Sequence, residues 1–559
     1  MKKIIKFFAI PLLLLGACTH LDQEFHDKVT PESFLKNAKD IQAVLYSPFT
    51  HVSQYLGGER WHLQEFTADQ ITVVTRGRHG YNGGEYERCY YHRWTLSEGR
   101  VWETWRTTLM GVALALDAKN DLGKLDYAKF GLTQADKEEH VNQLNTLIAF
   151  FYLCGLDYFG GLPVFESLEE ESLPRKTDLE TFRHIETLLK AGMLKLAKKK
   201  AGDREEGAFR QGGAAALLAR LYFNAEAYIG KRMFEECKRL CQDILDKKYG
   251  EYSLDPTWFG PHTFTNDKSP EIIWSIPSEF NKLEYAWFYG WFYHYNTPKY
   301  FDVDVGAFNG MNLTPSRSPT GALYTQYKLG SPFEKYNDAD LRKKPYKYLG
   351  GGSYEGMFIL GPHLTPDGKA INGSEEYNDQ PLVFVDQVGR FSEVGPGKRY
   401  AAAADLPSRI SEGEENTGIR LVKVPIPNNA DKSLRWAADN PVIRLTEIQY
   451  MLAECLLRTG DKVTAARLIN EVRKRNFKNG EDPAPVTAAN LDDAGYRMLD
   501  EWGMEFLGEG RRRTDLIRWD KFTTESWWAH EPSAPKYKRF PVPTQAISGN
   551  NNLRQNDGY

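Results

Sequence analysis

Apolar positions recur at helical spacing through much of the first half of the chain. Residues 31–52, 97–122 and 133–158 each place apolar side chains three or four positions apart, which indicates amphipathic helices. Thr133 stands where a helix cap belongs, and a glycine pair follows the third segment. The sequence therefore predicts long helices that pack through their apolar faces.

Two further pairs of helical segments resemble each other. The first pair covers residues 211–228 and 232–246, and the second covers 442–458 and 462–475. In both pairs a small residue lies where a neighbouring helix must approach, and a shorter amphipathic helix follows. This pattern is typical of stacked, tetratricopeptide-like helix pairs, and two unrelated hairpins are the alternative.

Residues 250–440 differ in character from the rest of the chain. They are rich in Gly, Pro, Asn, Asp and aromatic residues, with short apolar runs at 272–276 and 382–385. Irregular segments of such length usually carry function. We predict a mostly α-helical, tetratricopeptide-like scaffold, formed by residues 31–249 and 441–559, that carries a large loop-rich insert containing short strands.

The first residues have the features of a bacterial lipoprotein leader. Residues 1–17 combine lysines with an apolar stretch too short to span a bilayer. Gly16 and Ala17 precede Cys18, so we expect a signal peptide, lipid attachment at Cys18 and a tether over 18–30. An ordinary signal peptide followed by an incidental cysteine is the alternative. The prediction places the protein on a membrane without crossing it.

Composition narrows the possible functions. The chain has 559 residues, a net charge of −4 and interleaved charges, which argues against nucleic-acid binding. The cysteines besides Cys18 are few and odd in number, and Cys154 and Cys455 fall in apolar helical patterns typical of core residues. Histidines and cysteines show no metal-ligand spacing, and no nucleophile or phosphate motif is present. We therefore expect no cofactor, no metal and no catalysis.

The densest local feature is an aromatic segment at 285–295, where eight of eleven residues are aromatic. Trp287, Trp291 and Tyr295 are spaced by four, so an α-helix would place them on one face and Tyr289 elsewhere. Tyr and Trp join a flat apolar ring to a polar atom, which suits stacking on a sugar. We expect all four to contact a ligand; a well-packed helix is the alternative.

A glycine-rich loop over residues 76–84 forms a second candidate site. Its glycines and Asn82 favour turns with positive φ. Arg76 and Asn82 could hydrogen-bond to ligand hydroxyls, Tyr81 could stack, and Asp69 stands just before the loop. A purely structural turn is the alternative.

Charged residues crowd residues 502–519, where Glu505 and Glu509 stand near Arg512 and Arg513. Such spacing could suggest catalysis. We instead interpret it as an internal network of ion pairs that joins helices.

Several motifs together resemble one family, the starch-utilisation-type nutrient-uptake lipoproteins (SusD/RagB family) of Bacteroidetes outer membranes. Besides the lipobox, they are YFGGLPV at 158–164, PVIRLTEI at 441–448, EFLGEGRR at 505–512, DLIRW at 515–519, and FPVP at 540–543 with NLRQNDGY at 552–559. The resemblance covers essentially the whole mature chain. It implies an exposed helical protein that docks on a TonB-dependent outer-membrane transporter and closes over a bound oligosaccharide.

The glycine-rich loop departs from a branch of this family. That branch follows Thr-Arg-Gly with Asp-Trp and then Gly-Gly, whereas this chain has His79-Gly80 in place of Asp-Trp. The stacking tryptophan is therefore absent. Either Tyr81 substitutes for it, or the ligand differs.

The sequence thus predicts a non-catalytic, glycan-binding lipoprotein, anchored to the cell outer membrane and facing outward, that passes oligosaccharides to its transporter. The alternatives are a surface glycoside hydrolase, a peptide-binding relative on the same scaffold, and a structural repeat protein without a ligand.

Overall fold

The computed structural model describes residues 35–559, apart from the side chains of Gln54 and Tyr285. The predicted signal peptide, Cys18 and the tether lie outside the described residues.

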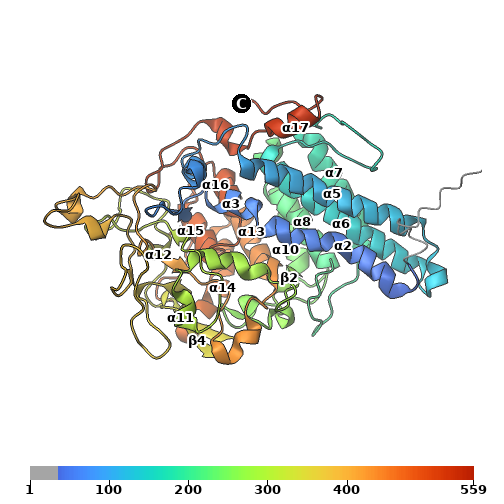
Figure 1. The fold of residues 1–559 in the computed structure, drawn as a ribbon. Coiled ribbons are helices and arrows are strands. Elements are labelled where there is room, and N and C mark those ends of the chain that lie inside the picture. The colour runs from blue at the N-terminus through green and yellow to red at the C-terminus, as the bar shows by residue number, and fades with distance from the viewer. Residues whose placement is uncertain (1–34) are drawn as a thin grey trace, which may run out of the picture.

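Long helices gather on one side of the molecule (Figure 1). They are α2 (Ala38–Leu56), α5 (Gly99–Lys124), α6 (Gln134–Phe159), α7 (Asp178–Gly192), α8 (Gln211–Phe223) and α10 (Phe234–Leu245). The same part of the sequence also contains the short helices α3 (Glu59–Glu65), α4 (Glu85–Tyr90) and α9 (Ala225–Ile229). Thr133 caps α6 as predicted, through a reciprocal bond with Asp136. The first predicted helix begins at Ala38 instead of residue 31, because Asn37 caps it.

The two similar helix pairs stack directly against each other. The second pair is α13 (Leu445–Arg458) and α14 (Lys462–Arg473), and α10 packs against both α8 and α13. Ala219 in α8 and Ala453 in α13 are fully buried, which allows this close approach. The predicted stacking of helix pairs is confirmed, although a long insert separates them in sequence.

The insert consists of loops, short helices and short strands, and lies opposite α2, α5 and α6 in Figure 1. The strands of the described chain form antiparallel pairs, and β1 is the one that comes from the N-terminal part: β1 (Ile71–Val73) with β3 (Met311–Leu313), β2 (Ile272–Ile276) with β10 (Asn440–Arg444), β4 (Lys347–Gly350) with β5 (Ser353–Glu355), β6 (Phe358–Ile359) with β9 (Arg420–Leu421), and β7 (Gly361–Pro362) with β8 (Val383–Phe384). The short α-helices of the insert are α11 (Thr297–Phe301) and α12 (Pro332–Lys335). The β2–β10 pair brings the two ends of the insert together beside α13.

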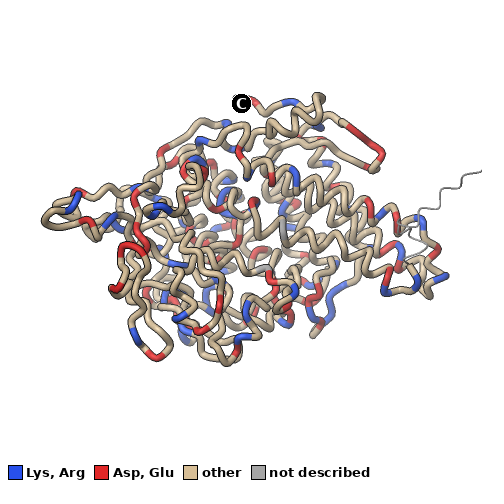
Figure 2. The backbone as a smooth tube through the Cα atoms, viewed as in Figure 1, with Lys and Arg blue, Asp and Glu red and all other residues tan. Residues whose placement is uncertain are grey.

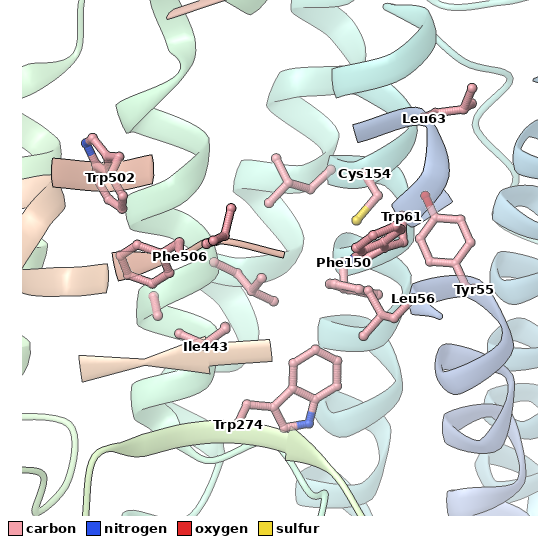
Figure 3. Close-up of a cluster of buried hydrophobic side chains, with 14 of the residues drawn as sticks. Tyr55, Leu56, Trp61, Leu63, Phe150, Cys154, Trp274, Ile443, Trp502 and Phe506 are labelled. Carbon is pink, nitrogen blue, oxygen red and sulfur yellow. The ribbon is translucent and has the colours of Figure 1, made fainter. Parts of the chain in front are cut away.

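The C-terminal segment returns to the helical part through α15 (Tyr496–Glu505), α16 (Arg512–Arg518) and α17 (Thr544–Gly549). Figure 3 shows Trp502 and Phe506 on one side of a buried cluster, with Trp61 and Phe150 on the other. Cys154 and Cys455 are buried core residues, as predicted, and all five cysteines of the described chain are free. One core therefore joins the N-terminal helices to the C-terminal segment.

The charged segment 502–519 is an internal ion-pair network, as predicted. Glu505 lies 3.0 Å from Arg342, 3.1 Å from Arg444 and 2.9 Å from Arg475, and all four side chains are buried. Burial alone would raise the pKa of Glu505, but these guanidinium groups lower it to about 2. The network thus holds a fully ionised carboxylate inside the fold.

Within the segment, Asp515 pairs with Arg511 at 3.1 Å and with Arg518 at 2.9 Å. Other charges of the segment pair with distant elements. Arg512 pairs with Asp69 at 2.7 Å, and Arg513 pairs with Asp157 at 3.1 Å. Glu509 lies 2.8 Å from Arg444. The pairs with Asp69 and Asp157 connect the C-terminal helices to the N-terminal part of the chain, and the pair with Arg444 connects them to β10.

Acidic and basic residues are interspersed along the chain in Figure 2. Within residues 35–559, no helix is both long and apolar enough to cross a membrane.

Candidate functional site

The aromatic segment is a 3₁₀-helix over Tyr285–Phe292 and not an α-helix. With three residues per turn, positions four apart point about 120° apart, so Trp287 and Trp291 do not share a face. Gly290 permits this packing, because a Cβ there would lie only 2.5 Å from the carbonyl oxygen of Gly306. The predicted single face of stacked rings is therefore wrong.

The segment divides into exposed and buried rings. Trp287 is 49% exposed, while Trp291 and Tyr295 are half-buried. Tyr289 is buried, and its hydroxyl donates to the carbonyl oxygen of Gly508 at 3.1 Å. The structure thus gives Tyr289 an internal role, in contrast to the ligand contact expected from the sequence.

Trp291 packs between two aromatic neighbours from other parts of the chain. Its ring centroid lies 5.2 Å from that of His62 and 5.9 Å from that of Phe308. Phe308 is 51% exposed. No pattern in the sequence points to Phe308, because a single ring in a glycine-rich stretch becomes notable only when the fold brings it to Trp291.

Arg76 is buried beside the backbone that follows Phe308. Its guanidinium donates to the carbonyl oxygens of Asn309 at 3.0 Å and Gly310 at 2.9 Å. Burial lowers the pKa of Arg76 to about 10, which leaves it charged at neutral pH. Arg76 therefore supports the backbone beside Phe308, and the contact with ligand hydroxyls expected of it is not available.

Asp69 is likewise buried and internally bonded. It pairs with Arg512 and accepts the Gly330 N–H at 2.8 Å. Burial alone would raise the pKa of Asp69, but Arg512 outweighs it and holds the pKa below its ordinary value. Asp69 joins the ion-pair network instead of facing a ligand.

Tyr81 and Asn82 are exposed, as a binding role requires. Tyr81 is 55% exposed. Asn82 has a φ of 41° and donates from Nδ2 to Glu85 at 2.6 Å. The carbonyl oxygen of Asn82's amide has no hydrogen bond to a described residue, so it can accept one from a ligand.

His79 and Gly80 stand where the related branch of the family carries Asp-Trp. The ring centroid of His79 lies 5.6 Å from that of Tyr295, and its Nε2 lies 3.2 Å from Glu375. The loop and the aromatic segment are thus in direct contact, and Glu375 adds a carboxylate from a third segment.

A chain of contacts links Asn82 to Trp291. Asn82 bonds to Glu85, and Arg100 lies 2.9 Å from Glu85 and contacts His62, which packs on Trp291. Burial, with Arg100 nearby, lowers the pKa of His62 to about 4, so His62 is neutral at pH 7. We call the surface formed by Tyr81, Asn82, Trp287, Trp291, Tyr295 and Phe308 the aromatic surface.

The aromatic surface has the composition of a binding site more than that of a catalytic one. Within the described residues, no group of three or more His, Cys, Asp or Glu side chains could hold a metal ion. Exposed aromatic rings beside amide and carboxylate groups suit recognition of a ligand with apolar faces and hydroxyl groups.

Comparison with known protein families shows to which family the chain belongs. The model of the SusD family matches residues 270–559, slightly more than half of the chain. The chain belongs to the SusD family. The resemblance inferred from the motifs is confirmed, and so is the predicted fold class, a mostly helical protein with only short strands.

One relative aligns with most of the chain and another with a shorter part of it. Starch-binding protein SusD of Bacteroides thetaiotaomicron is 25% identical over 475 residues, which are 81% of this chain and 79% of that protein. A SusD-like protein of Formosa agariphila is 30% identical over 140 residues, 23% of this chain and 26% of that protein.

Solved structures show the same fold. A SusD superfamily protein of Parabacteroides distasonis superimposes with a TM-score of 0.66 at 15% identity, covering 94% of this chain and 100% of that one. Surface glycan-binding protein A of Bacteroides thetaiotaomicron in complex with laminarihexaose gives a TM-score of 0.62 at 15% identity, covering 93% and 100%.

Proposed function

We propose that the protein is a non-catalytic, glycan-binding surface lipoprotein that captures oligosaccharides and delivers them to a partner TonB-dependent outer-membrane transporter. The observation that carries this proposal is the aromatic surface, in which Trp291 meets Phe308 and Tyr295 meets the glycine-rich loop at His79. Family membership supports it, as do the starch named for one relative and the laminarihexaose bound to a structural neighbour.

The exposed rings provide the apolar part of the binding energy. Tyr81, Trp287 and Phe308 each expose about half of their surface, which is costly in water unless a ligand covers it. The apolar face of a sugar ring can stack on such a side chain while its hydroxyls remain free for polar contacts. An open surface of this kind suits an extended chain of sugars.

Polar groups beside the rings orient the bound sugar through hydrogen bonds. The Asn82 amide accepts or donates, and the carboxylate of Glu375 accepts hydrogen bonds from sugar hydroxyls. His79 and Arg78 already contact Glu375, so its position is fixed before a ligand arrives. Such preorganisation reduces the entropy lost on binding.

The location of the protein in the cell is part of the same proposal. Cys18 would carry the lipid, and the tether would hold the described part of the protein at the outer face of the outer membrane. Labelling with a clickable fatty acid tests this step: wild-type protein should incorporate it, and the Cys18→Ala variant should not.

Calorimetry on the soluble chain starting at Thr19 tests the binding function. We expect heat release with one class among laminari-, malto- and xylo-oligosaccharides, and no change in the ligand's chain length afterwards. Shorter products would support the glycoside hydrolase alternative. Binding of peptides but of no glycan in the panel would contradict the proposal in favour of a peptide-binding relative.

A further inference from the structure

A cavity of about 120 Å³ lies behind the aromatic segment, where α3, α6, α8, β10 and the loop after Phe506 meet. Phe150 and Cys154 of α6 line it on one side, and Phe506 lines it on the other (Figure 3). Because a water molecule occupies about 30 Å³ of liquid, this volume holds a few waters or one small ion.

Arg60 of α3 lines this cavity and differs from the other charged groups around it. Its Nε is buried, and its guanidinium makes no hydrogen bond or ion pair to another described residue. Only the rings of Tyr55 and Tyr158 lie near its Cζ, each with its centroid at 5.9 Å. Gly510 leaves room for the group, since a Cβ there would lie 3.4 Å from Nη1.

The carboxylates that line the same cavity each have a cationic partner other than Arg60. Their ion pairs are Asp157 with Arg513 at 3.1 Å, Glu447 with Arg220 at 2.6 Å, and Glu509 with Arg444 at 2.8 Å. The oxygens of Asp157 also accept from Gln64, Thr514 and Tyr228. Among the arginines that line the cavity, Arg60 is therefore the one without an ion pair to a described carboxylate, since Arg220, Arg444 and Arg511 are all paired.

Arg60 is partly buried. A guanidinium with little water around it is stabilised by an anion that it can pair with, and contacts with tyrosine rings supply only part of that stabilisation. One unpaired cation balances one negative charge. A multiply charged anion would in addition be repelled by the carboxylates in the cavity wall.

We propose that this cavity binds a small monovalent anion, with the Arg60 guanidinium as its principal contact. The anion completes the charge balance of the interior and fills the space between α3 and the loop that contains Gly510.

The site lies directly behind the aromatic surface. Phe288 and Tyr289 line the cavity, while the neighbouring Trp287 faces solvent. Trp61 and Tyr289 both donate to the Gly508 carbonyl oxygen, at 2.9 Å and 3.1 Å. An anion in the cavity therefore stiffens the base from which the exposed rings project.

Co-crystallisation of the soluble chain with sodium bromide tests the proposal. We expect an anomalous peak inside the cavity, within hydrogen-bonding distance of the Arg60 guanidinium. A cavity that holds only water at 0.5 M bromide would overturn it. This outcome does not depend on whether any variant folds.

Chloride-35 line broadening tests the same site in solution. The wild type should broaden the chloride signal, and bromide should compete with chloride for the site. The Arg60→Met variant should lose most of the excess linewidth, while Arg239→Met, which removes an exposed arginine of α10, should retain it. Equal broadening by both variants would overturn the assignment to Arg60. Sulfate should compete at least tenfold less well than bromide; equal competition would contradict selection for a monovalent ion.

Discussion

Two segments of this chain are rich in side chains that often carry function, and the fold uses them in opposite ways. The charged segment 502–519 lies inside, where its carboxylates and guanidinium groups are paired with one another and with distant elements. The aromatic segment 285–295 reaches the surface, and three of the seven rings whose side chains are described remain partly exposed. Residue type alone would have nominated both as sites.

The difference lies in the partners that the fold supplies. Glu505 meets three arginines from three separate elements, so nothing remains for a ligand to satisfy. Trp287 meets solvent over about half of its surface, so a ligand can still bury it. A cluster of such side chains can bind a ligand only where some of its groups remain exposed or without an internal partner.

The largest effect should come from the charged segment. Replacing Glu505 by Gln removes the negative charge that three buried arginines share, and we expect a loss of about 3–5 kcal/mol in the free energy of unfolding. Urea denaturation measures it. The control is Glu103→Gln, which breaks an exposed pair with Arg106 and should cost under about 1 kcal/mol. Similar losses for both variants would show that the network is not the stabilising feature we describe.

Glu65 sharpens the contrast, because it is a buried carboxyl beside the charged segment without an ion-pair partner. It accepts the Gly510 N–H at 2.8 Å, its Oε2 has no hydrogen bond, and burial raises its pKa from 4.5 to about 7. Between pH 4.5 and about 7, the folded protein therefore carries a proton on Glu65 that the unfolded chain has lost. Its contribution to stability is complete below about pH 4.5 and is lost as the pH rises towards 7.

We therefore expect Glu65→Gln to match the wild type near pH 4.5 and to be more stable at pH 8, by up to about 3 kcal/mol. Unfolding measured at both pH values tests this. Glu481→Gln, at an exposed position, should show no such dependence on pH. A variant that is less stable than the wild type at pH 8 would mean that Glu65 is ionised and well solvated in the folded protein.

The sequence predicted the helical scaffold well, because caps such as Thr133 and apolar periodicity act locally. It predicted the internal role of residues 502–519 but not the partners of those residues, since Asp69 and Arg512 lie far apart in the chain. The same limit explains the errors at the site. Nothing near Arg76 in sequence indicates that residues 309–310 will take up its hydrogen bonds.

Trp287 tests the exposed half of the aromatic segment. Its removal deletes stacking area but little internal packing, so Trp287→Ala should weaken glycan binding about tenfold with an unchanged unfolding temperature. Calorimetry and thermal unfolding on the same sample measure the two effects. Leu283→Ala, which removes another exposed apolar side chain nearby in sequence, is the control and should bind normally. Unaltered affinity of Trp287→Ala would remove this ring from the site.

Tyr289 tests the buried half, and the smallest effect is expected there. Tyr289→Phe keeps the ring but deletes the hydrogen bond to Gly508, whose carbonyl oxygen still accepts from Trp61 at 2.9 Å. Because that acceptor stays satisfied, we expect a loss of about 1 kcal/mol in stability and no change in glycan affinity. A clear loss of affinity at unchanged stability would place Tyr289 in contact with the ligand, as its sequence position first indicated. Tyr289 would then belong with the ligand-binding rings of the aromatic segment and not with its internal ones.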